Sequence, residues 1–176
     1  EIVVIASEAS RIGALADLGG KSFCRLSATD LNTWQAPSLL MLANGLAPTS
    51  TLKEAIDVPD LDTLVEQVAA GDCDAAALAL DDFERIAGPD AQDSITRLPR
   101  TLALPFGVVM AADELPLGVR VALSGALSDF ARSAAGANTL NTLTGADRLT
   151  PYTDGALDDW DALIAQTGLD FAGFQN

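Results

Sequence analysis

The chain of 176 residues contains no histidine. Without an imidazole there is no Ser-His-Asp or Cys-His nucleophile and no ordinary general base near neutral pH. Every zinc or iron site with a histidine ligand is excluded as well. Catalysis by paired carboxylates or by a lysine remains open, although Lys21 and Lys53 are the two lysines of the chain. The sequence therefore argues against an enzyme, and it predicts no metal and no cofactor.

Basic residues are scarce, with 10 Lys and Arg against 25 Asp and Glu and a formal net charge of −15. Nonspecific binding to nucleic acid depends on clustered Lys and Arg, so neither nucleic acid nor an anionic membrane surface is an expected partner. A solvated acidic surface explains this charge balance without any partner. No apolar run reaches the roughly 18–20 residues that a membrane helix needs. The opening EIVVIASEAS also lacks the basic and long apolar segments of a signal peptide.

Cysteine is nearly absent too, because Cys24 and Cys73 are the two in the chain. Two cysteines are too few for a disulfide scaffold, and their separation excludes a CxxC redox motif. They are either two buried thiols or one bridge, and the fold decides between these alternatives.

Hydrophobic residues make up 49% of the chain, which is enough for a buried core. Short apolar runs predict strands, and runs with a spacing of three and four residues predict helices between them. This alternation over residues 1–101 predicts a doubly wound α/β fold with a mostly parallel sheet, whose ligands bind at the carboxyl ends of the strands. The predicted strands are EIVVIA, KSFCRL, LKEAIDV, CDAAALAL and SITRL, with RTLALPFGVVMA also strand-like, and the predicted helices are WQAPSLLMLANG, 61–71, DDFERIAG, 117–130, TLNTLTG and LDDWDALIAQTG.

Several segments, in this order and spacing, resemble the phosphate/phosphonate-type substrate-binding proteins of ABC transporters. The resemblance runs through nearly the whole chain, and it depends on the order of the segments because no single motif is specific. It implies a periplasmic-binding fold that captures a solute without chemistry. The segments are LADLGGKSFCR, TWQAP, LLMLANGLAP, VAAGDCDAAALALDDF, residues 102–130 and LNTLTGADRLTPYTDGALDDW.

The resemblance also implies a division of the chain. Residues 8–101 match the second lobe, residues 1–7 and 102–111 the crossing strands of the hinge, and residues 112–176 the returning helices and tail. A first lobe of around a hundred residues has no counterpart here, so we expect the apolar faces of residues 1–6 and 117–130 to need a cover. A second copy of the chain, the missing lobe or membrane subunits of a transporter would supply it, since large exposed apolar patches are rare on monomers. The expected location is periplasmic or extracellular, with the export signal outside this chain.

The same fold makes a disulfide between Cys24 and Cys73 feasible. Their strands would be parallel neighbours about 4.8 Å apart, and a bridge needs Cα atoms within roughly 7 Å. We therefore predict this disulfide, provided that the protein is exported.

The loop TDLNTWQAP raises the question of what this protein binds. In the resembled family the matching loop is Ser-Thr-Ser-Gly, and its hydroxyls and free N–H groups hold a phosphoryl group at a helix N-terminus. Here Asp30 brings a negative charge to that place, Leu31 replaces a hydroxyl, and Thr33 retains one. Asp30 acts either as a helix cap or as a contact for a cationic or polyhydroxylated ligand, so a simple phosphonate should bind poorly.

The remaining predicted ligand contacts follow from the same alignment of segments. Asp81 follows the strand CDAAALAL at a position that faces the cleft in the family, and the alternative is that Asp81 and Asp82 cap the helix DDFERIAG. Phe106 stands where the family has a polar contact. The predicted ligand-binding residues are Asp30, Asn32, Thr33, Trp34, Asp81 and Phe106, with Trp34 also interpretable as a packing residue.

Three functions are compatible with these residues. The first is a solute-binding domain for a small polar ligand, and the second is a ligand-free structural or sensory module on the same fold. An enzyme based on the carboxylates of Asp30 and Asp81 is the third and is disfavoured by the missing histidine.

Overall fold

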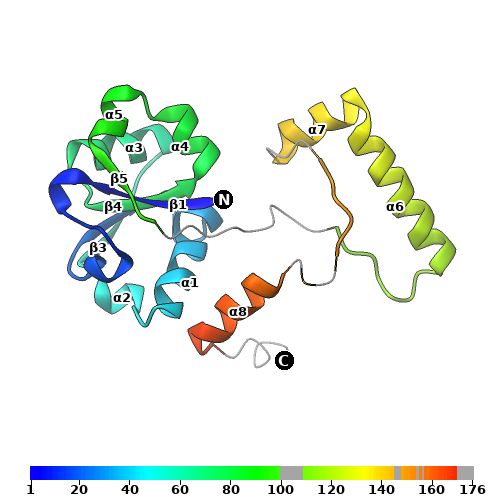
Figure 1. Ribbon diagram of the computed structural model, residues 1–176, viewed down its shortest axis with the longest axis horizontal. Helices are drawn as coiled ribbons and strands as arrows, with labels where there is room; N and C mark the ends of the chain where they lie inside the picture. Colours follow the sequence, from blue (N-terminus) through cyan, green and yellow to red (C-terminus); the bar gives the residue numbers. More distant parts are fainter. Residues whose placement is uncertain (100–108, 145–147, 154, 156, 170–176) are drawn as a thin grey trace. The chain divides into compact units, whose positions relative to one another are not determined.

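The computed structural model describes residues 1–99, 109–144, 148–153, 155 and 157–169. The chain divides into two compact units, one formed by residues 1–104 and 159–176 and the other by residues 105–158 (Figure 1).

The first unit is built on a five-stranded sheet with the order β3-β2-β4-β1-β5. Strand β2 runs parallel to both β3 and β4, whereas β1 is antiparallel to β4 and to β5. Four strands therefore share one direction and β1 alone opposes them, which confirms the predicted α/β fold with a mostly parallel sheet. The strands are β1 (Ile2–Ser7), β2 (Ser22–Arg25), β3 (Glu54–Asp57), β4 (Ala75–Ala79) and β5 (Ile95–Arg97).

Helices cover both faces of this sheet (Figure 1). On one face the core gathers Val4, Phe23 and Met41 with Leu163, and on the other it gathers Ile5, Leu64 and further side chains. The helical segments of the unit are η1 (Glu8–Ser10), η2 (Leu15–Leu18), η3 (Leu31–Gln35), α1 (Ala36–Ala43), α2 (Pro48–Thr51), α3 (Leu61–Ala70), α4 (Leu80–Ile86), α5 (Pro89–Asp93) and α8 (Asp158–Thr167).

Strand β1 corrects one expectation from the sequence. All six of its residues are buried, with Val4 in one core cluster and Val3 and Ile5 in the other. The strand lies between β4 and β5, so helices of the same unit cover both of its faces. The expectation that residues 1–6 need a cover from another chain is therefore wrong.

Helix α3 follows its predicted pattern closely. Leu64, Val65 and Val68 are buried, and the helix ends at Gly71, whose φ of 80° is left-handed and therefore favours glycine. Its start is capped by Asp60, whose side chain accepts a hydrogen bond from the Thr63 amide at 2.8 Å.

Helix α4 starts earlier than predicted. Its N-cap is Ala79, and Asp81 and Asp82 lie in its first turn without capping it. The predicted cap at these two aspartates is therefore wrong, because the helix begins at Leu80, directly after the strand. Asp82 instead accepts a hydrogen bond from Arg85 at 2.7 Å.

The second unit contains two helices, α6 (Leu117–Arg132) and α7 (Ala134–Thr144), which pack against each other. Both agree with helices predicted from the sequence, although α7 begins before TLNTLTG. In α6 the apolar side chains are largely exposed, as expected for residues 117–130, with Leu117 at 68% and Val121 at 64% exposure. The predicted crossing strand at 102–111 lies largely outside the described residues.

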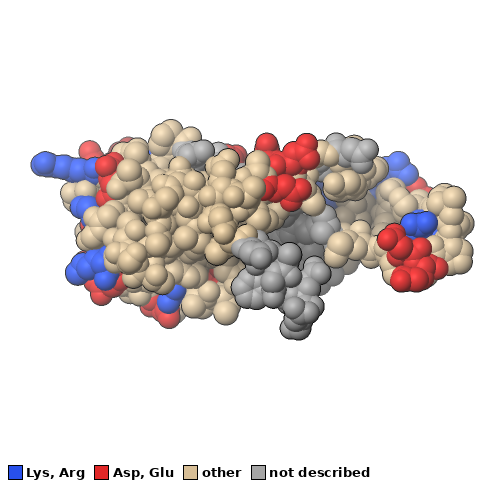
Figure 2. All heavy atoms as spheres, turned by 90° about the horizontal axis from the view of Figure 1, so that it is seen from below, with Lys and Arg blue, Asp and Glu red and all other residues tan. Residues whose placement is uncertain are grey.

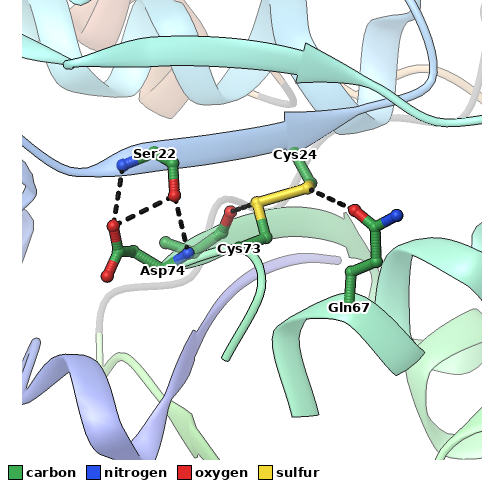
Figure 3. Close-up of a disulfide and its surroundings, with 6 residues drawn as sticks. Ser22, Cys24, Gln67, Cys73 and Asp74 are labelled. Atoms are coloured by element: carbon green, nitrogen blue, oxygen red, sulfur yellow. Dashed lines mark hydrogen bonds between the residues drawn. A yellow bond between two sulfur atoms is a disulfide. The ribbon is translucent and has the colours of Figure 1, made fainter. Parts of the chain in front are cut away.

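The predicted disulfide between Cys24 and Cys73 is present and joins β2 to the turn before β4 (Figure 3). The two Cα atoms lie 6.0 Å apart, and neither cysteine is exposed to solvent. Next to it, Asp74 Oδ2 accepts hydrogen bonds from the amide and the hydroxyl of Ser22, and the Asp74 amide donates to Ser22 Oγ. Covalent and hydrogen bonds therefore fix β2 against β4 at one place.

Within the described residues, no helix has the length and apolar composition that crossing a membrane requires.

Candidate functional site

The predicted ligand loop connects β2 to η3, a single π-helical segment that runs directly into α1. Asp30 is the N-cap of η3, and its Oδ1 accepts hydrogen bonds from the amide of Thr33 at 2.7 Å and from its hydroxyl at 2.6 Å. Thr33 Oγ1 in turn accepts a hydrogen bond from the Leu26 amide at 3.1 Å. Thr33 is 1% exposed, so this chain of bonds fixes the loop to the end of β2.

The Asp30 cap has a direct chemical consequence. The first amides of a helix lack partners within the helix, and they are the groups that bind an anion at a helix N-terminus. Here the Thr33 amide already donates to the protein's own carboxylate. The cap interpretation of Asp30 is therefore confirmed, and an incoming oxyanion would meet a negative charge where it needs a donor.

Trp34 connects this loop to the strand. Its ring packs edge-to-face against Phe23, with centroids 6.0 Å apart, and the guanidinium carbon of Arg25 lies 4.3 Å from its centroid. Arg25 Nε donates a hydrogen bond to Asp57 Oδ1 at 2.7 Å. Trp34 is thus partly a packing residue, and its ring also contacts the guanidinium of Arg25 at the carboxyl end of β2.

The other predicted contacts are less closely associated. Asn32 is partly exposed on η3, and Asp81 is exposed in the first turn of α4. Since β2 and β4 are parallel neighbours, Asp81 and the loop lie at the same edge of the sheet. No hydrogen bond or ion pair joins Asp81 to residues 30–34 in the part of the chain that is described. Phe106 lies outside the described residues.

Among the hollows of the described structure are two that are not lined by Asp30, Asn32, Thr33, Trp34 or Asp81. One has a volume of about 340 Å³ between Ala14–Ala16 and Leu98–Pro99, and the other about 540 Å³ between α3 and the α4–α5 region. The predicted contacts that the structure describes instead follow the carboxyl ends of β2 and β4. Within the described residues no cluster of His, Cys, Asp and Glu is suited to a metal ion.

Arg25 was not among the residues predicted from the sequence. The signal for it was present, because a charged residue ends the otherwise buried strand SFCR directly before the candidate loop. Strand alternation also places it on the face of Phe23. Its contacts depended on Asp57, which is 32 residues away and joins the site through the pairing of β2 with β3.

Several basic side chains elsewhere on the surface have an acidic side chain beside them, although acidic residues outnumber basic ones in the chain. Figure 2 shows Lys and Arg side chains in small groups with acidic side chains beside them on the face that it draws. Lys53 and Glu54, for example, form an ion pair of 3.0 Å. Arg25 differs from such exposed pairs, because its side chain is only 16% exposed.

Comparisons with known proteins agree with this fold. Two structures of a Xanthomonas citri protein, bound to chloride ion and to ATP, give TM-scores of 0.71 and 0.73 at 20% and 19% identity. They match 95% of this chain, which spans 64% and 65% of theirs. The structure of PhnD1 from Prochlorococcus marinus, in complex with methylphosphonate, has a TM-score of 0.58 at 13% identity. The match covers 95% of this chain and 66% of the length of PhnD1.

These identities are low enough that the three structures establish the fold alone. A comparison with curated protein sequences finds no match. The family model for the phosphonate periplasmic substrate-binding proteins of ABC transporters matches residues 1–157, which is most of the chain. The chain therefore belongs to the phosphonate-type periplasmic substrate-binding proteins of ABC transporters.

Proposed function

We propose that this chain is the greater part of an extracytoplasmic solute receptor that captures a small polar ligand without catalysis. In this proposal the ligand is not a simple phosphonate, and the protein delivers it to membrane subunits of an ABC transporter. The predicted contacts Asp30, Asn32, Thr33, Trp34, Asp81 and Phe106 contribute to its site. A further lobe, outside this chain, closes over the ligand.

One observation supports the altered ligand most directly. The Asp30 carboxylate accepts hydrogen bonds from the Thr33 amide and hydroxyl, two donors that an oxyanion would otherwise use. Two like charges ~4 Å apart repel by roughly 1 kcal/mol in water and by about 4 kcal/mol at a protein surface. A dianionic phosphonate would meet about twice that repulsion, whereas a neutral, cationic or singly charged ligand would meet less.

A second function is favoured by the exposed apolar side chains of α6. Leu117, Val121 and Phe130 are 68%, 64% and 43% exposed. A face of this kind is typical of a surface that another chain covers. The alternative proposal is therefore a structural or sensory module that forms a homodimer or contacts a protein partner and binds no small ligand.

A thermal-shift screen of small polar metabolites separates these two functions. A ligand present at 100 times its dissociation constant adds about 2.7 kcal/mol of stability, which is a clear rise in Tm. Solute capture predicts at least one such ligand, and the Asp30→Asn or Asp81→Asn variant should weaken its binding. A flat screen together with concentration-dependent dimerisation in sedimentation would refute solute capture and favour the second function.

A further inference from the structure

We propose that Arg25 is the ligand-recognition residue of this site and that the ligand class it selects is small carboxylates. This inference rests on the proposed solute capture and specifies its chemistry. The Arg25 side chain projects from the last residue of β2 beside the candidate loop.

The Arg25 guanidinium is held from two sides. Trp34 stacks on it at 4.3 Å from the ring centroid, and Asp57 accepts a hydrogen bond from its Nε at 2.7 Å. The ring itself is fixed by its edge-to-face contact with Phe23. A planar cation held in this way has already lost most of its rotamer freedom, so binding a ligand costs less conformational entropy.

The contact to Asp57 uses only one edge of the guanidinium. Arg25 has five N–H donors, and Nε donates the only hydrogen bond that the side chain makes to other described residues. The two terminal amino groups therefore remain for a ligand. Their parallel N–H bonds match the two oxygens of a carboxylate, which is the bidentate geometry that arginine forms best.

Local charge selects a carboxylate over a phosphate or phosphonate. Asp57 is bonded to Arg25, and the Asp30 carboxylate lies in the adjoining loop. Arg25, Asp57 and Asp30 together carry a formal charge of −1, so the net repulsion that they exert is twice as large for a dianion as for a monoanion. A monocarboxylate, particularly one that carries a cationic or hydroxyl group towards Asp30, therefore fits this set of charges best.

The chain offers a matched control at Arg97. Its guanidinium carbon lies 6.0 Å from the centroid of the Phe83 ring, and it pairs with Glu84 at 4.0 Å. The arrangement is again arginine, aromatic ring and carboxylate, but β5 and α4 supply it rather than the candidate loop. Arg97→Gln should therefore remove a similar surface interaction without changing carboxylate binding.

The test uses the full chain, acetate as the smallest carboxylate, and NMR titration of the Trp34 indole and Arg25 Nε–H signals. Sodium acetate from 0 to 50 mM is compared with sodium chloride of equal ionic strength and with acetamide. We expect a saturable shift with acetate alone, unchanged in Arg97→Gln and reduced at least tenfold in apparent affinity in Arg25→Gln. Asp57→Asn removes both a contact that fixes the guanidinium and a charge that repels the anion, so it should change the acetate affinity by a smaller factor than Arg25→Gln.

An equal response to chloride, or a saturable acetate shift of the indole that persists in Arg25→Gln, would overturn the inference. Lack of saturation with acetate would overturn it as well. These outcomes are separate from failure of the proposed function. If the metabolite screen yields a ligand whose binding is the same in Arg25→Gln and wild type, solute capture stands and the role of Arg25 falls. If the screen is flat and acetate does not saturate either, solute capture and the role of Arg25 fall together.

Discussion

Reduction of the Cys24–Cys73 disulfide should weaken the fold by an amount that follows from its position in the chain. The bridge closes a loop with a sequence separation of 49 residues. In the chain-entropy treatment a loop of this length restricts the unfolded state by about 4 kcal/mol at 25 °C. The chain has no other cysteine, so a reductant acts on this bond alone.

The surroundings of the sulfurs determine how much of this loss should be observed. Gln67 Oε1 lies 3.4 Å from Cys24 Sγ, and the Ala75 carbonyl oxygen lies 3.3 Å from Cys73 Sγ. After reduction each thiol would therefore have an acceptor for its proton. Because these contacts limit the cost of burying two thiols, the reduced protein should fold, with most of the loss arising from the missing cross-link.

Urea unfolding with and without a phosphine reductant measures this loss. With an m-value of about 2 kcal/mol per molar urea, a loss of about 4 kcal/mol lowers the midpoint by roughly 2 M. A Cys24→Ala/Cys73→Ala variant should have a lowered midpoint as well and should not respond to the reductant. An unchanged midpoint in the reduced wild type would refute the reasoning, as would a response of the double variant to the reductant.

Five further substitutions test the fold, two of them as controls. Phe23→Ala should lower the free energy of unfolding by about 3–5 kcal/mol because the ring is fully buried. Leu123→Ala on the exposed α6 is the control and should change this free energy by at most about 0.5 kcal/mol. Gly71→Ala should lower the free energy of unfolding by about 1–2 kcal/mol because the φ of Gly71 is 80°. Gly88→Ala is the control and should leave urea unfolding unchanged, because the φ of Gly88 is −66° and an added Cβ would meet open space. Backbone and side-chain hydrogen bonds lower the pKa of Asp60, so its contribution to stability is present above its unfolded pKa of about 3.9 and is lost as pH falls through the folded value. Asp60→Asn should therefore flatten the acid limb of stability against pH, and an unchanged limb would contradict this assignment.

Strands β1 and β4 were predictable because their sequences are short, apolar runs bounded by turns. Ile2–Ser7 and Ala75–Ala79 are nearly fully buried, as continuous apolar runs indicate. Helix α3 was predictable from its spacing and its terminal glycine. Helices α2 and α5, with 4 and 5 residues, were missed because one turn is too short to show a period.

The candidate site was predictable only where its interactions are local. The Asp30 cap spans three residues, so a side-chain acceptor before a helix was enough to predict it. The contacts of Arg25 join three segments, because Trp34 follows on η3 and Asp57 comes from β3. Such contacts appear only after the sheet order is known. That helices of its own unit cover β1 could not be predicted for the same reason, since its neighbours β4 and β5 are distant in sequence.

We infer that the Asp30 carboxylate takes the place in which an oxyanion would otherwise bind. Calorimetric titration of methylphosphonate into the wild type and the Asp30→Ser variant is the most direct test of this inference. Serine keeps the ability to cap a helix while it removes the charge. Loss of the repulsion should strengthen binding by at least 1.4 kcal/mol, which is a factor of ten in the dissociation constant. The same substitution at Asp60, the cap of α3, should leave methylphosphonate binding unchanged. We expect weak or undetectable binding to the wild type and measurable binding to Asp30→Ser, whereas micromolar binding to the wild type or equal affinities of both proteins would contradict the account.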